Sequence, residues 1–406
     1  MTTSADVLIL GGGLVGSTLA IALDVHGVSS IVVDPADPDV ILAAGFDGRA
    51  SAVASGPQRM LEAIGVGDDL LGKGCPIESI RCSDGLDPGA LDFVPGESNG
   101  ALGVMYENRT LRQVLQRRAG AAAGIDLRMK TRAATVERGE GRVTATLSDG
   151  TSVTAQLLIA AEGRKSPTRE AAGIRMAAWN YHHNAIITAF DHEHPHDNTA
   201  YEIFYPAGPF AILPLLPVEG RNRSALVWSV GDREIVGMMK LSDRAFLAEA
   251  SKKMGGFLGA LSNLAPRSFY PLNFQHAARI TDRRLALVGD AAHGIHPIAG
   301  QGLNLGLRDV ATLVEVLVEG KRLGLDLGDE QVLARYQRWR GIDTLAVAAA
   351  TDGLTHLFGI PGRAASAVRR FGLSAVQKLP PLKAFFMSEA RGENGDLPKL
   401  LQGMMA

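Results

Sequence analysis

The residues with the clearest chemistry lie between Leu285 and Asp309, in the run LALVGDAAHGIHPIAGQGLNLGLRD. An apolar stretch that favours a buried strand breaks at Gly289. Asp290 is therefore placed just beyond the carboxyl end of a strand, where open α/β sheets bind ligands. Its carboxylate could accept hydrogen bonds from ligand hydroxyl groups. A Gly/Pro-rich crossing follows, and then apolar residues at helical spacing, so backbone N–H groups at a helix start would favour an anion in the same space.

A second group of chemical residues lies near the N-terminus, where Gly11, Gly13 and Gly16 form a GxGxxG pattern. The pattern follows an apolar strand and opens an apolar helix. Glycine at these positions permits a tight turn, close approach of a pyrophosphate and close helix–strand packing. A further strand ends at Asp34, at the spacing expected of the carboxylate that binds a ribose. We therefore predict a dinucleotide site, for FAD or NAD, and the motif at Asp290 favours FAD.

The composition is that of an ordinary soluble protein large enough for more than one domain, with 406 residues, 46% hydrophobic and 21% charged. A net charge of −2 gives no electrostatic case for a nucleic-acid partner. The two cysteines form no CxxC pair and imply no disulfide framework, which favours a reducing compartment. No basic leader precedes the first strand, and no apolar run approaches the ~20 residues that span a bilayer. We expect a cytoplasmic protein, at most peripheral at the inner membrane, and make no prediction of its oligomeric state.

The run from Leu285 to Asp309 resembles the second flavin-binding motif of class A flavoprotein monooxygenases, which have the para-hydroxybenzoate hydroxylase fold. Its sequence, GDAAH…HPIAGQGLNLG…RD, is similar to that of the subgroup that hydroxylates ubiquinone precursors. The resemblance implies that Asp290 holds the ribityl chain of FAD and that the helix start faces the pyrimidine end of the isoalloxazine ring. The cofactor-binding residues implied by this motif are Asp290, Pro297, Gly300, Gln301, Gly302, Leu303 and Asn304.

Two arginines match further positions of the same family. Asp47 and Arg49 fit an Asp-x-Arg pattern that precedes a helix against the flavin, which implies that Arg49 lies near the cofactor. Arg109 fits an arginine at a helix start that reaches the FAD. Two structural interpretations stay open: Asp47 and Arg49 could be a surface ion pair at a helix start, and Arg109 could be a solvated helix arginine.

The segment from Ala161 to Arg169 resembles the DG motif of the family, whose acid, serine and arginine are associated with FAD and the pyridine nucleotide. Glu162 stands where most members carry aspartate, one methylene shorter. The remaining positions match: Gly163, Ser166 and Arg169.

The resemblance implies an α/β fold, with a Rossmann-like FAD-binding domain, an inserted antiparallel-sheet substrate domain and C-terminal helices. We expect the FAD-binding domain to comprise residues 1–75, 100–176 and 272–330. The substrate-binding sheet domain would comprise 76–99 and 177–271, and the C-terminal helical region 331–406. Within the sheet domain, Gly208-Pro209 and Leu213-Pro214-Leu215 fit the ubiquinone subgroup.

Histidines crowd between His182 and His196 and include an HxHxH run that could bind a metal. The stretch from His192 to Asn198 is instead typical of a polar turn, and no second ligand cluster supports a metal site. We therefore predict a solvated loop and no metal. His293 and His296 lie beside the predicted flavin on a Gly/Pro loop, where HxxH spacing gives poor support for zinc.

Residues 362–391 carry six lysine and arginine residues and a single acid, Glu389, with phenylalanine and leucine residues between them. Such a segment can lie on an anionic membrane surface. It can equally cap the core or contact a partner chain, and these alternatives stay open. Pro380 and Pro381 would interrupt any long amphipathic helix.

The activity that the resemblance implies is hydroxylation of the ring of a prenylated phenol in ubiquinone biosynthesis. FAD would act through a C4a-hydroperoxide, with NAD(P)H and O2 as co-substrates, so no catalytic side chain is predicted. No second GxGxxG is present, so NAD(P)H would bind transiently. One alternative is hydroxylation of a small aromatic acid, which would need a buried arginine in the substrate sheet. Arg221 and Arg223 are the candidates, but we expect them in a polar turn between Glu219 and Ser224. Another is a non-catalytic flavin-binding scaffold subunit of a biosynthetic complex.

Overall fold

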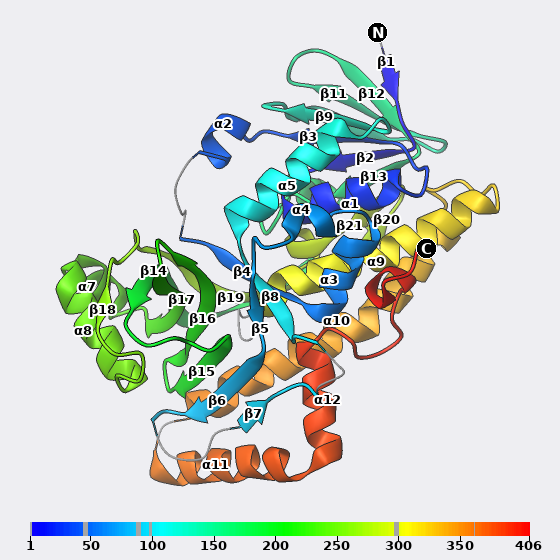
Figure 1. Ribbon diagram of the computed structural model, residues 1–406. Coiled ribbons are helices and arrows are strands. Elements are labelled where there is room, and N and C mark those ends of the chain that lie inside the picture. The colour runs from blue at the N-terminus through cyan, green and yellow to red at the C-terminus, as the bar shows by residue number, and fades with distance from the viewer. Residues whose placement is uncertain (1, 44–47, 87–90, 97–99, 296–299, 361) are drawn as a thin grey trace.

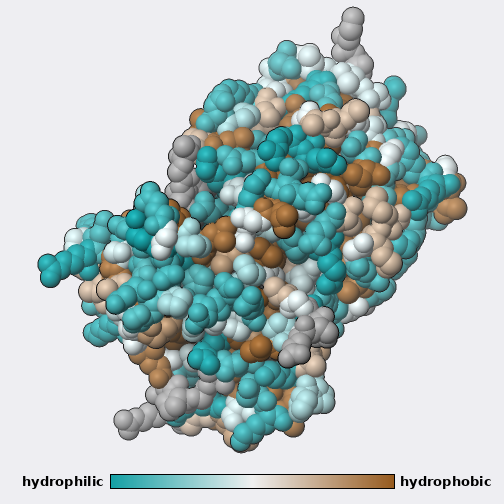
Figure 2. Space-filling model, viewed as in Figure 1, coloured by the Kyte–Doolittle hydropathy of each residue, from teal (hydrophilic) through white to brown (hydrophobic). Residues whose placement is uncertain are grey.

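The structure is a computed structural model that describes residues 2–43, 48–86, 91–96, 100–295, 300–360 and 362–406. Figure 1 shows a lobe built on a parallel sheet, a second lobe built on a large mostly antiparallel sheet, and C-terminal helices that run along both. On the face drawn in Figure 2 the surface is mostly hydrophilic, with hydrophobic residues in separate patches.

The central sheet of the first lobe is parallel except for its edge strand β20. In the order β20-β21-β13-β2-β3-β9 its strands are Thr281–Asp282, Leu285–Leu287, Leu157–Ala160, Val7–Leu10, Ser30–Asp34 and Ile125–Met129. Every residue of β2 and β13 is buried, as expected of strands covered on both faces. The register pairs Ala160 with both Leu10 and Leu287, so the carboxyl ends of these three strands lie side by side.

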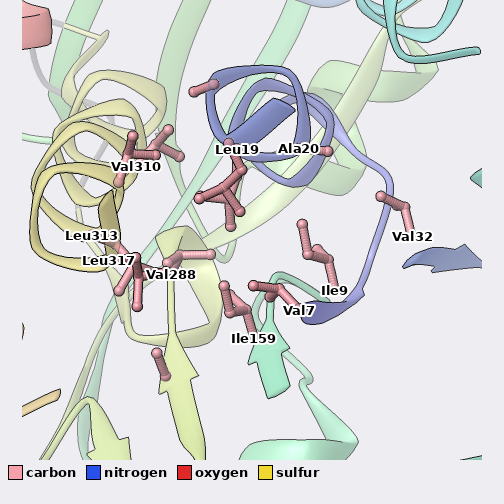
Figure 3. Packing of buried hydrophobic residues seen from close by; sticks show 14 of the residues in the cluster. Val7, Ile9, Leu19, Ala20, Val32, Ile159, Val288, Val310, Leu313 and Leu317 are labelled. Atoms are coloured by element: carbon pink, nitrogen blue, oxygen red, sulfur yellow. The ribbon is translucent and has the colours of Figure 1, made fainter. Parts of the chain in front are cut away.

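Helix α1 (Leu14–Asp24) and helix α9 (Gln301–Arg322) pack against each other on this sheet. Figure 3 shows Leu19 of α1 and Val310, Leu313 and Leu317 of α9 gathered with strand residues such as Ile159. The helices approach closely because Gly306 has no side chain, and a Cβ there would press on Val15 and on the backbone of the second predicted loop. Helix α5 (Asn108–Ala121) also contacts α1.

Two smaller sheets and several short helices complete the first lobe. The order β4-β8-β5 comprises Ala50–Ala54, Gly103–Glu107 and Cys75–Ile77, and β1-β12-β11-β10 comprises Thr2–Ser4, Ser152–Ala155, Val143–Leu147 and Ala133–Arg138. The short helices are α2 (Pro38–Ile41), α3 (Ser55–Ala63), α4 (Gly67–Leu70), α6 (Pro167–Ala171) and the 3-10 turn η1 (Gly289–Ala291).

The second lobe is a mixed sheet whose strands are mostly antiparallel and whose outer face is covered by α7 (Ile235–Lys240) and α8 (Asp243–Met254). In the order β22-β19-β14-β17 the strands are His293–Gly294, Ser268–Ala277, Met176–His192 and Arg221–Gly231. The sheet continues as β16-β15-β6-β7, which are Gly208–Val218, Thr199–Tyr205, Ser79–Asp84 and Leu91–Phe93, and β18 (Leu261–Ser262) pairs with β14. A separate aromatic core under α8 includes Phe190, Phe210, Trp228 and Phe246.

The C-terminal region is helical, with α10 (Glu330–Gly359), α11 (Arg363–Lys378), α12 (Pro380–Ala390) and the 3-10 turn η3 (Lys399–Gln402). Helix α10 contacts both lobes. Near its start, the Tyr336 hydroxyl donates to the Leu287 carbonyl, and near its end Phe358 stacks on Phe204. The domain limits expected from the sequence stay a prediction. Strands β6 and β7 lie in the second sheet, and so do β19 and β22, which extend into the range 272–330 expected for the FAD-binding domain.

Candidate functional site

The glycines of the first loop have different surroundings. Gly11 adopts a φ of +104°, and a Cβ there would collide with the Ala161 carbonyl. A Cβ on Gly16 would collide with the Gly11 carbonyl. Gly13, by contrast, has nothing within 4 Å of where its Cβ would be, and it forms the N-cap of α1. Gly11 and Gly16 thus allow the chain to pack closely. Gly13 leaves open space at a helix N-terminus, where a pyrophosphate is favoured.

Asp34 lies at the end of β3, directly beside this loop. Its Oδ2 accepts a hydrogen bond from the Gly12 N–H at 2.6 Å, and its Oδ1 accepts from the Ala36 N–H at 2.7 Å. Two backbone donors therefore orient the carboxylate, and each oxygen keeps a lone pair for a ligand hydroxyl.

The second predicted loop begins at the carboxyl end of β21. Asp290 lies in η1 with 44% of its side chain exposed. Gly300, in the left-handed region at φ +63°, forms the N-cap of α9, and a Cβ on Gly302 would meet nothing within 4 Å. Gln301 and Leu303 belong to the first turn of α9. Pro297 and His296 lie outside the described residues.

Asn304 has a role that its position in the motif did not reveal. Its side chain is buried and bonds to the backbone of β4: Oδ1 accepts from the Ala54 N–H and Nδ2 donates to the Ala52 carbonyl, both at 2.9 Å. The amide therefore fixes the start of α9 against β4. The side chain is therefore engaged by the protein itself, and contact of Asn304 with the cofactor stays a prediction.

A buried ion network supports the Asp290 loop from behind. Asp309 accepts hydrogen bonds from the Gly289 N–H at 2.8 Å, His293 Nε2 at 2.6 Å and Arg340 Nε at 2.7 Å. The three side chains of Asp309, His293 and Arg340 are almost completely buried. Burial alone would raise the pKa of Asp309, but the charges and hydrogen bonds of His293 and Arg340 outweigh it and hold this pKa below its usual value. Neither Asp309 nor Arg340 has a local sequence pattern that indicates this role.

Arg164 connects the Asp290 loop to the second lobe. Its Nη1 donates to Asn273 Oδ1 on β19 at 2.5 Å, its Nε lies 3.4 Å from Asp290 Oδ2, and its Nη2 donates to the Ile295 carbonyl at 3.4 Å. The residue stands inside the DG-like segment but received no role from the sequence. Its hydrogen-bond partners are more than one hundred residues away in the sequence. The local sequence offers one signal for a role, the adjacent Gly163 of the DG-like motif.

Glu162 is directed along its own chain. Its Oε2 accepts hydrogen bonds from the Ser166 hydroxyl at 2.6 Å and the Thr168 N–H at 3.2 Å, so it stabilises the start of α6. Gly163, at φ +80°, makes the turn between them. Arg169 is buried and donates to the Ala291 carbonyl at 3.2 Å, which ties this segment to the Asp290 loop. Direct contact of Glu162 and Gly163 with FAD stays a prediction.

The two predicted arginines lie at the edge of the same region. Arg49 is exposed, and its carbonyl accepts from the Asn108 N–H at 3.0 Å, beside the first turn of α5. Arg109 is half-buried, and its Nε donates to the Leu42 carbonyl at 3.2 Å. Asp47, the acid of the Asp-x-Arg pattern, lies outside the described residues.

Tyr270 on β19 is a further residue that the sequence did not indicate. Burial raises the pKa of its phenol, while the nearby positive charges of Arg164 and Arg49 act in the opposite direction. The net shift is upward, so the hydroxyl stays protonated at neutral pH and can donate a hydrogen bond. Its electrostatic neighbours, Arg164, Arg49 and Asp290, all come from the predicted cofactor region.

The histidine-rich stretch is not simply a solvated loop, because His192 ends β14 and is buried. Its Nδ1 lies 2.7 Å from the His194 carbonyl and its Nε2 lies 2.9 Å from Ser224 Oγ. His196 Nε2 lies 3.0 Å from the Leu215 carbonyl. These rings therefore hold neighbouring strands together. Over the described ranges, no group of three or more His, Cys, Asp or Glu residues could hold a metal ion.

Arg221 and Arg223, expected in a polar turn, instead open β17. Arg221 Nε bonds to the buried Asp191 at 2.7 Å, and its Nη2 lies 2.9 Å from Glu219. Arg221 therefore pairs with Asp191 of β14 and with Glu219 of the adjoining turn, and its side chain is 46% exposed rather than buried. This arrangement gives no support to a site for the carboxylate of a small aromatic acid.

Two loops at the carboxyl edge of one parallel sheet thus offer what a dinucleotide with a polyol chain requires. One offers open space at Gly13 and the oriented carboxylate of Asp34; the other offers a half-exposed Asp290 and the N-terminus of α9. Fold and site define an FAD-binding protein with the para-hydroxybenzoate hydroxylase fold.

Comparison with known proteins supports this assignment. A family model described as an FAD binding domain matches residues 4–342, so the chain belongs to that family. The chain is 46% identical over 403 residues to the ubiquinone hydroxylase UbiL of Rhodospirillum rubrum, which covers 98% of this chain and 93% of that protein. It is 32% identical over 390 residues to the 3-demethoxyubiquinol 3-hydroxylase of Escherichia coli, with 95% and 98% covered.

Among solved structures, the p-nitrophenol 4-monooxygenase of Pseudomonas putida superposes with a TM-score of 0.80. The match covers 97% of this chain and 99% of that one, at 19% identity, which shows the shared fold. In the described part of the chain, no helix has the length and apolar character needed to cross a membrane.

Proposed function

We propose that this protein is an FAD-dependent monooxygenase that hydroxylates the aromatic ring of a prenylated phenol in ubiquinone biosynthesis, with NAD(P)H and O2 as co-substrates. The observation that carries the substrate class is the 46% identity to a ubiquinone hydroxylase over 98% of the chain. The loops at Gly13 and Asp290, which meet at one sheet edge, support the cofactor. Because a prenyl tail partitions into lipid, contact with a membrane surface is part of the proposal.

In this proposal Asp34 would hold the adenosine ribose and the open side of Gly13 would admit the pyrophosphate. Asp290 would hold the ribityl chain. The backbone N–H groups at the start of α9 would stabilise negative charge on the pyrimidine edge of the flavin, since they are fixed donors at the positive end of a helix dipole. FAD, when bound and reduced by NAD(P)H, supplies the activation of O2.

On the substrate side, Asn273 of β19 bonds to Arg164, and Tyr270 of the same strand lies within electrostatic reach of Arg164, Arg49 and Asp290. Arg164 joins Asn273 to the Asp290 loop, so it would keep the sheet closed over the reacting ring and limit access of water. Tyr270 keeps its proton and could donate a hydrogen bond to the oxygen of the phenol. A prenyl tail would add binding energy of ~0.8 kcal/mol per buried CH₂ group, remote from the ring.

The test is turnover by purified protein supplied with FAD, NADPH and a short-chain prenylated phenol in air. NADPH loss, hydrogen peroxide and product mass are followed together. We expect a product heavier by one oxygen atom and little peroxide. NADPH oxidation that yields only peroxide would contradict the proposed substrate, and no oxidation with either NADPH or NADH would contradict the proposed enzyme.

A further inference from the structure

Helices α11 and α12 are apolar on the side that faces the protein. Leu373 and Val376 of α11 and Phe386 and Met387 of α12 pack against the core cluster that includes β6 and β7 residues. This inward face satisfies the requirement that an amphipathic helix bury one apolar stripe. Figure 1 shows α11 at the lower end of the molecule, with α12 rising from its C-terminal end.

The same two helices carry a second apolar face, which is directed to solvent. On α11, Val368 is 66% exposed and Phe371 is 77% exposed, and Leu379 at the junction is 52% exposed. On α12, Leu382 and Phe385 are 38% and 49% exposed. Val368 and Leu379 are three helical turns apart, and the residues of each pair, 368 with 371 and 382 with 385, are about one turn apart. Large apolar side chains exposed at these spacings on two consecutive helices favour an interaction surface.

Lysines adjoin the outer-face residues in the sequence, and the nearby acid Asp92 of β7, whose N–H bonds to Gln377, is paired with Arg81. Lys378 is exposed and Lys383 is half-exposed. The arginines that point inward are neutralised there, since Arg369 pairs with buried Asp84 at 3.0 Å and Arg391 pairs with Glu393 at 2.8 Å. The acid of the segment, Glu389, accepts a hydrogen bond from the Asn394 amide. The surface therefore combines exposed Phe and Leu with lysine, which is complementary to an anionic lipid interface.

These helices are also fixed to the lobe that carries the substrate sheet. Asp84 at the end of β6 accepts from Ser366 Oγ at 2.5 Å and from Arg369 Nε at 3.0 Å. Phe358, just before α11, stacks on Phe204 of β15 at 3.9 Å between ring centroids. A bilayer that held α11 and α12 would therefore hold the substrate lobe at the lipid surface.

We propose that the outer face of α11 and α12, made of Val368, Phe371, Leu379, Leu382 and Phe385 and flanked by Lys378 and Lys383, docks on an anionic lipid bilayer. Its role rests on the proposed function, because a prenylated phenol resides in the bilayer. The apolar side chains insert into the headgroup region, while the lysines contact anionic headgroups. The protein then takes its substrate from the surface on which it rests.

The first experiment measures binding of the FAD-loaded full-length protein to vesicles without substrate. Vesicles of phosphatidylcholine and phosphatidylglycerol at about 7:3 are compared with pure phosphatidylcholine. We expect the Phe371→Ser/Phe385→Ser variant to bind the mixed vesicles at least about tenfold more weakly than wild type. Lys378→Gln/Lys383→Gln should lose about tenfold on mixed vesicles and little on neutral ones.

The matched control is Leu71→Ser/Leu323→Ser, which removes two apolar side chains of similar exposure, 83% and 74%, from the first lobe. It should bind vesicles like wild type. Equal binding by wild type and the phenylalanine variant would overturn the proposal. A wild-type dimer that the same variant dissociates, with no vesicle binding, would also overturn it and assign the face to a second copy.

A second readout separates this proposal from the proposed function. The phenylalanine variant should slow hydroxylation of a long-chain phenol carried in vesicles and leave a short-chain soluble phenol unaffected. If wild type binds vesicles but hydroxylates neither phenol, the docking surface stands and the proposed reaction fails. If hydroxylation of both phenols is slowed equally in the variant, the helices act on the active site and the docking role fails.

Discussion

Gly13 and Gly16 lie three residues apart in one loop, yet a methyl group would have opposite consequences at the two positions. At Gly16 it would collide with the Gly11 carbonyl, whereas at Gly13 it would meet only open space. We predict that Gly16→Ala lowers the thermal stability of the cofactor-free protein. Gly13→Ala should leave that stability close to wild type and weaken FAD binding by at least about tenfold, since the methyl group occupies the approach of the pyrophosphate. Melting curves of the cofactor-free protein and flavin titration measure the two effects, and wild-type FAD affinity in Gly13→Ala would contradict the site.

Asp309 is predicted to position the Asp290 loop. Asp309→Asn leaves Arg340 buried without its counter-charge, so we expect a loss of about 3 kcal/mol of unfolding free energy and weaker FAD retention. Asp92→Asn, which breaks the exposed pair with Arg81, is the control and should cost less than about 1 kcal/mol. Equal effects of the two substitutions would show that the buried network has no special role.

The same network has a predictable pH dependence. The pKa of Asp309 in the folded protein is lowered, so its stabilising contribution is present above the usual carboxyl value of 3.8 and is lost as pH falls below it. The stability difference between wild type and Asp309→Asn should thus be constant near neutral pH and shrink below about pH 4. Thermal unfolding across this range measures it, and a difference that shrinks near pH 7 would point to another titrating group.

At the scale of elements, much of the architecture could be predicted from sequence, because strands covered on both faces and glycine loops leave local patterns. A strand, a GxGxxG loop, a helix, a second strand and an acid follow one another in the sequence, and this order predicted β2, α1 and β3. The motif at Asp290 predicted β21 and α9. Side-chain direction could not be predicted, since it depends on distant neighbours. Asn304 bonds to β4, 250 residues earlier in the chain, and only the fold brings them together. Arg221 was expected in a turn because its surroundings are polar, yet cross-strand pairing places it in β17.

Arg164 connects the Asp290 loop to strand β19. We predict that Arg164→Lys retains FAD but lowers product formed per NADPH oxidised several-fold, with peroxide making up the difference, since lysine lacks the planar fork that contacts Asn273 and Ile295 together. The adjacent exposed Lys165→Ala is the matched control. Unchanged coupling of NADPH oxidation to product in Arg164→Lys would contradict the closure role.

At the scale of the whole molecule, α10 spans both lobes over roughly 45 Å. Buried ion pairs hold the C-terminal region at two places, Asp309 with Arg340 on the first lobe and Asp84 with Arg369 on the second. None of these pairs leaves a local signal in the sequence, because the partners lie far apart along the chain. This explains why packing, membrane contact and partner contact stayed open for residues 362–391.

The Asp84–Arg369 pair is predicted to hold α11 and α12 on the substrate lobe. Arg369→Met should destabilise this attachment by about 3 kcal/mol, because Asp84 stays buried without its partner. The double variant Asp84→Ala/Arg369→Met should recover most of the loss, since both charges are removed. Limited proteolysis within α11 and α12 reports the detachment. Equal protease sensitivity in wild type and the single variant would contradict the account.

The central claim is that this protein transfers one oxygen atom of O2 to a prenylated phenol. The most direct test is the mass of the product formed under heavy-isotope O2 by the FAD-loaded protein with NADPH. We predict a hydroxylated product whose added oxygen carries the heavy isotope. A product whose new oxygen comes from water, or NADPH oxidation that yields only labelled peroxide with every prenylated phenol supplied, would contradict it.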